Sequence, residues 1–296
     1  MTLFYLKKMK KVSIQGIKGA FHEEAAQNYF KSEIEIIPNL TFEDVINSVQ
    51  NQTSDYGIMA IENTISGTIH PNLNLIQQSG LKITGEVYLP ITQNLIAQPG
   101  TKLEDIIQVT SHPMAIDQCR DFLGKLHNVR LFESKDTALS IQQIAKHKIY
   151  DAAAIGSKIA AEYYGLEIIA ENIETNKKNY TRFLILERQN SHLMDFDKAS
   201  LAVTLPHKKG SLALILNIIA FFNINLTKIE SLPILGEPWH YLFYMDVQFE
   251  TNQSYQQMIQ ALKPLSDEIK ILGEYNSGIQ SFNQIHNSQY ETINQN

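Results

Sequence analysis

The sequence predicts a mixed α/β protein with two successive regions, and three observations support this. Apolar residues make up 44% of the 296 residues and charged residues 19%, a balance typical of chains with a packed core. From residue 11 to residue 188, strand-like apolar runs alternate with segments of helical periodicity. After a polar stretch at residues 189–198, the pattern restarts with a different order of elements.

The first region has the pattern of an α/β sheet with crossover helices. A glycine turn at Gly16 and Gly19 leads into a helix that contains Ala25 and Ala26. Helical periodicity over residues 41–50, 113–126 and 137–146 predicts further helices. Strands are expected at residues 11–17, 34–37, 56–61, 83–96, 106–110, 151–155 and 181–186.

The second region, residues 199–275, predicts a ferredoxin-like unit. Its strands are expected at residues 199–205, 226–234, 239–249 and 269–274, and its helices at residues 211–222 and 255–265. The resulting order βαββαβ is that of the split ferredoxin-like motif. The tail, residues 276–296, is rich in Asn, Gln and Ser and is expected to be disordered.

Composition and motif content exclude several classes of function. A net charge of −6, from 31 acidic and 25 basic residues, disfavours a nucleic-acid partner. Cys119 is the single cysteine, so an internal disulfide and a Cys-rich zinc site are excluded. The histidines lack metal-ligand spacing and no phosphate-binding glycine loop occurs, so we expect no metal and no cofactor. Without a membrane-length apolar run or a secretion signal, we expect a cytoplasmic protein with no membrane partner.

Two polar segments stand where a strand begins or ends. Arg182 opens the apolar run of the segment Asn179-Tyr180-Thr181-Arg182-Phe183, so it is either an edge-strand arginine paired with a surface acid or a forked donor for a carboxylate. The segment Glu62-Asn63-Thr64-Ile65-Ser66-Gly67 follows a strand, where ligands bind in open α/β sheets. A simple turn that caps a helix fits the second segment equally well.

A third segment runs from Ser111-His112-Pro113 to Gln118-Cys119 and places a hydroxyl and a proline at a helix start. We interpret His112 as a capping residue rather than a general base, and Cys119 as a small buried apolar residue.

In this order the segments resemble the prephenate dehydratase family, from about residue 12 to residue 275. The resemblance rests on the three segments above and on the glycine-rich opening Gly16-Ile17-Lys18-Gly19-Ala20-Phe21. It implies a catalytic region at residues 11–188, made of two α/β lobes similar to periplasmic binding proteins, with the active site in the cleft between them. It also implies a regulatory ACT domain at residues 199–275.

The resemblance further implies a lyase of phenylalanine biosynthesis that converts prephenate to phenylpyruvate by decarboxylating dehydration, without a cofactor. Thr181 would donate to the departing oxygen and Arg182 would hold a carboxylate, with Asn63 and Gln118 as further catalytic residues. The residues implied to bind substrate are Glu62, Ser66, Ser111, Phe183, Gly19 and Ala20.

Regulation by phenylalanine is implied as well, at a pocket between paired ACT domains of a homodimer or homotetramer. The implied effector residues are Gly210, Ser211, Leu212, Glu230 and Ser231. The sequence departs from the family pattern at Leu232, where arginine is usual, at His22, where Ser or Thr is usual, and at Met114, where Gln is common.

Two alternatives stay open at the level of sequence. Arogenate dehydratase performs the same chemistry on a substrate with an amine in place of the keto group. A non-catalytic amino-acid sensor with an ACT domain would have the same regions, although it would not need the segment Thr181-Arg182-Phe183.

Overall fold

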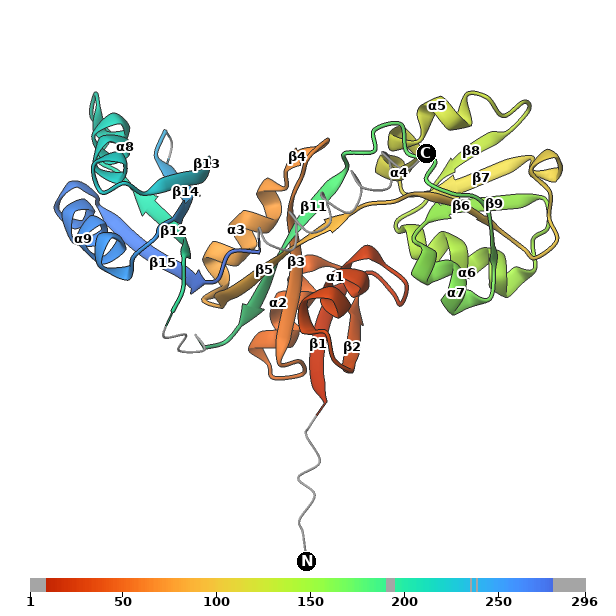
Figure 1. Cartoon of the computed structure of the whole chain (residues 1–296), viewed down its shortest axis with the longest axis horizontal. Helices are drawn as coiled ribbons and strands as arrows, with labels where there is room; N and C mark the ends of the chain where they lie inside the picture. The colour runs from red at the N-terminus through yellow and green to blue at the C-terminus, as the bar shows by residue number, and fades with distance from the viewer. Residues whose placement is uncertain (1–8, 190–194, 235, 238, 279–296) are drawn as a thin grey trace, which may run out of the picture. The chain divides into compact units, whose positions relative to one another are not determined.

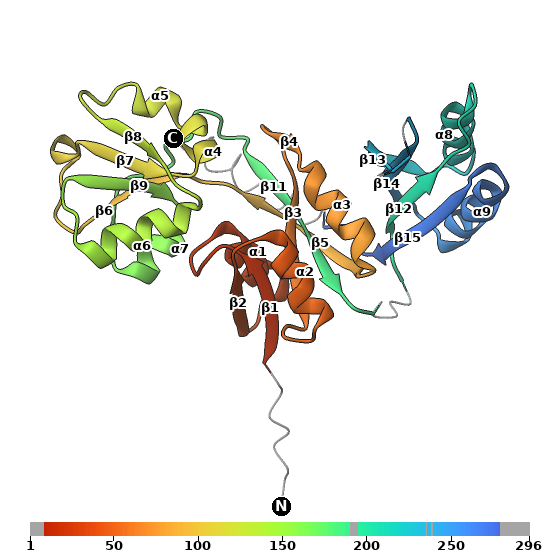
Figure 2. The ribbon, with the colours of Figure 1, turned by 180° about the vertical axis from the view of Figure 1, so that it is seen from behind.

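The computed structural model describes residues 9–189, 195–234, 236–237 and 239–278 (Figures 1 and 2). These residues form two compact units. Unit 1 contains residues up to 67 and residues 88–183, and unit 2 contains residues 68–87 and those from 184 onward. The sequence places residues 68–87 in the first region, whereas in the structure they pack within unit 2.

One lobe of unit 1 is built on parallel strands. The central strand β1 (Lys10–Gln15) pairs in parallel with both β2 (Ile34–Asn39) and β3 (Tyr56–Asn63). Helices α1 (Phe21–Phe30) and α2 (Phe42–Gln50) form the crossovers that parallel strands require. Beyond β3 lies β11 (Tyr180–Glu187), and the two-residue β4 (Gly67–Thr68) also pairs with β3. Most of β5 (Lys82–Pro90) belongs to unit 2.

The other lobe of unit 1 has a five-stranded sheet in the order β10-β6-β9-β7-β8. Its strands are β6 (Asn94–Ala97), β7 (Gln108–Ser111), β8 (Arg130–Glu133), β9 (Ala152–Gly156) and β10 (Glu167–Ala170). Its helices are α4 (Pro113–Gln118), α5 (Arg120–Leu123), α6 (Thr137–His147) and α7 (Lys158–Tyr164), with a 3-10 turn at Leu103–Asp105. Two apolar clusters form its core, one with α4 and α5 and the other with α6 and α7.

Two expected elements differ in the structure, and two observed strands were not expected. The run at residues 83–96 is two strands rather than one, because Pro90 lacks an N–H for the ladder and the chain leaves β5 there. The helix expected at residues 113–126 is interrupted at Cys119 and becomes α4 and α5. The short strands β8 and β10 were not expected; all four residues of β8 are exposed, so it has no buried face for an alternating pattern to reveal.

Unit 2 contains the predicted βαββαβ order. Its elements are β12 (Lys198–Thr204), α8 (Ser211–Phe221), β13 (Asn225–Pro233), β14 (Tyr241–Gln248), α9 (Asn252–Leu262) and β15 (Glu268–Tyr275), with a 3-10 turn at Lys263–Leu265. The strands are ordered β13-β14-β12-β15, and each neighbouring pair is antiparallel. Helices α8 and α9 cover one face of this sheet, where the apolar core lies (Figures 1 and 2). The predicted mixed α/β fold is therefore confirmed.

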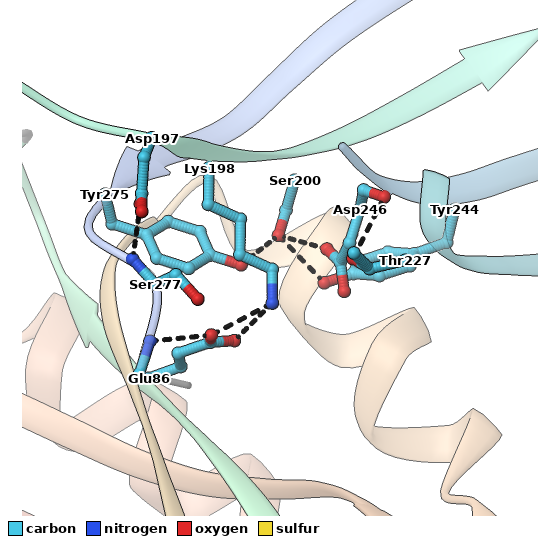
Figure 3. A network of polar contacts seen from close by, with 10 residues as sticks. Glu86, Asp197, Lys198, Ser200, Thr227, Tyr244, Asp246, Tyr275 and Ser277 are labelled. Atoms are coloured by element: carbon cyan, nitrogen blue, oxygen red, sulfur yellow. Dashed lines mark hydrogen bonds and ion pairs between the residues drawn. The ribbon is translucent and has the colours of Figure 1, made fainter. Parts of the chain in front are cut away.

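A network of polar side chains on β12, β14 and β15 reaches the segment at residues 68–87, which includes α3 (His70–Ser79) and most of β5 (Figure 3). Lys198 Nζ lies 2.9 Å from both carboxylate oxygens of Glu86, with both side chains buried. The hydroxyl of Ser200 donates to Asp246 and also contacts the hydroxyls of Tyr244 and Tyr275.

The first residues of the tail that was predicted to be disordered make hydrogen bonds with unit 2. The backbone N–H groups of Ser277 and Gly278 donate to Asp197 and Glu86, while residues 279–296 lie outside the described residues. Among the helices that the structure describes, none combines the length and the apolar character needed to cross a bilayer.

Candidate active site

The side chain of Asn63, at the end of β3, joins two predicted catalytic segments. Its Nδ2 lies 2.7 Å from Asn179 Oδ1, 3.0 Å from Thr181 Oγ1 and 3.2 Å from the carbonyl oxygen of Tyr180. Its Oδ1 accepts hydrogen bonds from the backbone N–H groups of Ile65 and Ser66. Because both ends of the amide are engaged, its orientation is fixed, with the N–H donors toward β11.

Thr181 lies at the start of β11 with only 8% of its surface exposed. Its hydroxyl oxygen accepts a hydrogen bond from Asn63, and no acceptor for its own proton lies among the described residues. A hydroxyl that accepts from one side and has a free proton can donate to a ligand on the other. The geometry therefore suits Thr181 to the donor role that the sequence predicts.

Gln118, at the end of α4, enters the same network. Its Oε1 accepts from Asn179 Nδ2 at 3.0 Å and from Gln93 Nε2 at 3.2 Å. Asn63, Gln93, Gln118 and Asn179 are all at least nine-tenths buried. Three of the four predicted catalytic residues, Asn63, Gln118 and Thr181, are thus brought together by hydrogen bonds through Asn179.

Arg182 follows Thr181 on β11. Successive side chains of a strand point to opposite faces, so Arg182 faces away from Thr181. The guanidinium carbon lies 6.0 Å from the centre of the Tyr88 ring, and the side chain is 4% exposed. Arg182 is therefore buried on a strand that is not at the edge of its sheet, and it lies on the face opposite Thr181. The same alternation along β3 separates Glu62 from Asn63.

The glycine-rich loop that precedes α1 packs against the other lobe. The N–H of Gly19 donates to Glu23 at 2.7 Å, and its carbonyl accepts from the Ser157 hydroxyl at 2.6 Å. A Cβ at Gly19 would lie 2.8 Å from the Cα of Ala160, so only glycine fits. Ala20, 3% exposed, is the residue that caps α1. The sequence assigns Gly19 and Ala20 to substrate, whereas here both polar backbone groups of Gly19 are occupied by protein.

Two other predicted substrate-binding residues lie in the interior. Ser111 is fully buried, and its hydroxyl donates to the carbonyl of Ile155 at 2.8 Å, which ties β7 to β9. Phe183 is 1% exposed. Both side chains therefore lie in the protein interior.

His22 packs next to Phe183 and is only partly exposed. The two rings meet edge to face with their centres 5.0 Å apart, and Phe42 lies 5.5 Å away on another side. Nε2 of His22 is buried without a hydrogen-bond partner among the described residues. Burial lowers the pKa of this imidazole to about 4, so it is neutral at physiological pH.

Ser66 and Met114 meet between the two lobes of unit 1. The exposed Ser66 hydroxyl lies 3.3 Å from the sulfur of Met114, at the start of α4.

Near the glycine loop, burial raises the pKa of Asp136, and a Cβ at Gly16 would lie 3.0 Å from its carboxylate. Burial, and secondarily Glu174, raises the pKa of the Cys119 thiol to about 12, which fits the inert buried residue predicted from sequence.

Two of the predicted effector residues, Ser211 and Leu212, line a cavity in unit 2. This cavity has a volume of about 520 Å³, and Lys208, Lys209 and Phe243 also line it. Leu232 lines a different cavity of about 590 Å³, and His240 borders both. Gly210 has a φ of +85° where α8 begins, and Ser231 is exposed on β13.

Glu230 turns toward the segment at residues 68–87 rather than into these cavities. It accepts hydrogen bonds from Thr68, His70 and Lys228, and these bonds lower the pKa of its carboxyl against the opposing effect of burial. Within one chain, Glu230 thus lies outside the cavity that Ser211 and Leu212 line.

Sequence reasoning missed Gln93 as a member of the site. It lies between β5 and β6, inside the apolar run that was expected to be one strand. The signal that could have found it is Pro90, which ends the first strand three residues earlier.

Comparison with known proteins identifies the family. The family model described as prephenate dehydratase matches residues 12–191. The bifunctional chorismate mutase/prephenate dehydratase of Enterobacter agglomerans is 33% identical over 273 residues, which cover 90% of this chain and 70% of that protein. An arogenate dehydratase/prephenate dehydratase of Arabidopsis thaliana is 37% identical over 285 residues, covering 90% and 71%.

Solved structures extend the similarity to most of the chain. The prephenate dehydratase of Arthrobacter aurescens, solved in complex with L-Phe, has a TM-score of 0.80 and 26% identity, covering 97% of this chain and all of that one. A protein described as a novel type of quorum-quenching acylase has a TM-score of 0.82 and 27% identity, covering 90% and 98%. The sequence matches, which span the Asn63–Gln118–Thr181 network, place this chain in the prephenate dehydratase family.

Proposed function

We propose that this chain converts prephenate to phenylpyruvate, carbon dioxide and water, with the network around Thr181 as its active site. The observation that supports this most directly is the hydrogen bond from Asn63 to the Thr181 hydroxyl, which leaves the threonine proton free. Family membership supports the choice of substrate.

The reaction needs little from the protein besides orientation and one proton. In the substrate, the bond between the ring and its carboxylate breaks, and the electron pair moves into the ring. The ring C–O bond breaks at the opposite end, and the oxygen leaves with its electron pair and takes up a proton as water. Because the product ring is aromatic, the driving force is already present in the substrate. Holding the ring with the breaking bonds aligned and supplying the proton accounts for the catalytic task.

Thr181 is assigned the role of donor to the departing oxygen. A threonine hydroxyl is a weak acid, but Asn63 donates to its oxygen, and chains of hydrogen bonds polarise their members. The bond from Asn63 makes the threonine a stronger donor and directs its proton away from Asn63. Asn63 is therefore placed behind Thr181, with its own N–H groups directed toward β11.

Gln118 is assigned a neutral hydrogen bond to the substrate. Both lone pairs of its Oε1 are used within the protein, so its Nε2 is the free end of the amide. Ser66, exposed beside this network, is assigned a second contact. Arg182 and Glu62 are assigned to the support of β11 and β3, because alternation places them on the faces opposite Thr181 and Asn63.

We also propose that residues 11–188 form the catalytic domain and residues 199–275 an ACT regulatory domain that binds phenylalanine. The cavity beside Ser211 supports an amino-acid ligand, because lysines at its edge suit a carboxylate and Leu212 and Phe243 suit an aromatic ring. The L-Phe complex of the Arthrobacter aurescens relative supports the choice of ligand. We further propose that the protein forms a homodimer or homotetramer and is located in the cytoplasm.

The deciding experiment is an absorbance assay for phenylpyruvate with the purified full chain and prephenate, repeated with arogenate. We expect turnover of prephenate, and slower turnover of arogenate. The opposite ranking would identify an arogenate dehydratase, which the Arabidopsis thaliana relative makes a real alternative. No turnover of either substrate would contradict the proposed activity.

A further inference from the structure

We infer that Gln93 is a positioning residue that determines which end of the Gln118 amide faces the substrate. The inference rests on the proposed function and extends it to a residue outside the motifs that mark the family in this sequence. It follows from the hydrogen bonds of three buried amides, those of Gln93, Gln118 and Asn179.

The position of Gln93 is fixed by its backbone. Its N–H donates to Glu174 Oε2 at 2.8 Å, and its carbonyl accepts from the N–H of Ile173 at 2.7 Å. The side chain is 2% exposed. A residue held at both backbone groups and enclosed on all sides presents its side chain in one direction.

Two donors meet at one oxygen of Gln118. Nε2 of Gln93 lies 3.2 Å from Gln118 Oε1, and Nδ2 of Asn179 lies 3.0 Å from the same atom. An amide oxygen has two lone pairs, so both are used. If the Gln118 amide turned over, its own N–H groups would face these two donors. The pair of donors therefore holds Nε2 of Gln118 on the side away from the network, free to donate.

The orientation of the Gln93 amide leaves one of its own polar atoms unpaired within the described part of the chain. Its own Oε1 is buried without a hydrogen-bond partner among the described residues. Turning the Gln93 amide over would place that oxygen against Gln118 Oε1, so the unpaired acceptor cannot be relieved in this way. A buried acceptor without a partner is retained in proteins where another requirement outweighs it. Here the requirement is a donor toward Gln118.

Gln93 can be changed without touching the proton donor. Asn179 orients Gln118 too, but it also accepts from Asn63, which contacts Thr181. Gln93 has no hydrogen bond to Asn63 or Thr181. A substitution at Gln93 therefore isolates the orientation of Gln118.

The test compares Gln93→Glu with wild type between pH 6 and pH 8, using prephenate turnover. At pH 8 the ionised carboxylate has no donor, so the Gln118 amide turns over and kcat/KM falls about ten- to hundredfold. Protonation supplies an O–H donor to the same oxygen, so activity relative to wild type recovers toward pH 6. Burial and the nearby Glu174 raise the pKa of a carboxyl introduced here above its usual range.

Gln98 provides the matched control. It is a buried glutamine five residues away, 7% exposed, whose Nε2 donates to the carbonyl of Ile144. Gln98→Glu should lower stability without an acid recovery of activity. Unchanged kcat/KM in Gln93→Glu at pH 8, or the same pH profile in both variants, would overturn the inference. If Gln93→Glu does not fold, Gln93→Met takes its place and should lose about fivefold or more in kcat/KM at every pH. A Gln93→Met variant with the kcat/KM of wild type would also overturn the inference.

A second readout is independent of turnover. The side-chain amide resonances of Gln118, followed by NMR, should shift with pH in Gln93→Glu and not in Gln98→Glu. Resonances that stay unmoved in both variants would refute the role of Gln93 even in an active enzyme. A wild-type protein inactive on prephenate would refute the proposed function, while the NMR comparison would still decide the orientation of Gln118.

Discussion

Thr181 makes the most specific prediction at the scale of single residues. Thr181→Val keeps the shape of the side chain and removes its hydroxyl, so turnover of prephenate should fall by about 100-fold or more, the scale of a lost positioned proton donor. Steady-state assays measure this loss, and the thermal midpoint should change little.

Thr181→Ser is the control for that substitution, because it restores the hydroxyl that accepts from Asn63. It should recover much of the activity. A Thr181→Val variant with near-normal phenylpyruvate formation would remove Thr181 from the mechanism.

His22 predicts how stability responds to acid. The folded protein holds this imidazole with a pKa of about 4, whereas an unfolded chain binds the proton near pH 6.5. Between these values the unfolded state binds more protons, so the contribution of His22 to stability is complete above pH 6.5 and declines as pH falls toward 4. At pH 5 the loss should be about 1 to 2 kcal/mol.

Urea unfolding of wild type and His22→Phe at pH 7.5 and pH 5 measures this contribution as a difference between the two proteins. The difference is needed because Glu24 acts with the opposite sign. Burial raises the pKa of Glu24 to about 7, so its contribution is lost as pH rises. An equal acid-induced loss in wild type and variant would contradict the assignment to His22.

At the scale of elements, the glycine loop and α7 form a contact that any side chain would disrupt. Gly19 has a φ of +91°, and a Cβ there would lie 2.8 Å from Ala160. Gly19→Ala should therefore combine backbone strain with a steric clash and lower the free energy of unfolding by about 2 to 4 kcal/mol.

Gly80→Ala separates the two effects, because Gly80 has a φ of +72° with nothing within 4 Å of an added Cβ. It should lower the free energy of unfolding by only about 1 kcal/mol. Chemical denaturation measures both, and equal losses would show that the contact with α7 contributes nothing.

The sequence predicts elements well where one face is buried and poorly where none is. Strands β1, β3 and β12 have buried interior residues and were expected close to their observed bounds. The exposed β8 has no such pattern. The break at Cys119 also gives no local signal, because the residues on both sides of it favour a helix.

At the scale of the whole molecule, the buried pair of Glu86 and Lys198 joins segments that are 112 residues apart within unit 2 (Figure 3). Glu86→Gln removes one charge and leaves the other buried, so unit 2 should lose about 3 to 5 kcal/mol of stability. Urea unfolding followed by circular dichroism measures this loss.

The double variant Glu86→Gln with Lys198→Met removes both charges and keeps an oxygen for the N–H of Gly278. It should be more stable than Glu86→Gln alone, because no unpaired charge remains. Additive losses in the double variant would contradict a direct interaction between the two charges.

The sequence by itself determined the fold class, the βαββαβ order of unit 2 and the segments that contain Asn63, Gln118 and Thr181. These depend on local periodicity and on short motifs, which are properties of neighbouring residues. Only the tertiary structure decided that Gln93 joins these residues, that Arg182 faces away from Thr181, and that residues 68–87 pack within unit 2. Each of these depends on the direction of a side chain or on a contact between distant segments, and the free energy of such contacts arises only when the chain is folded.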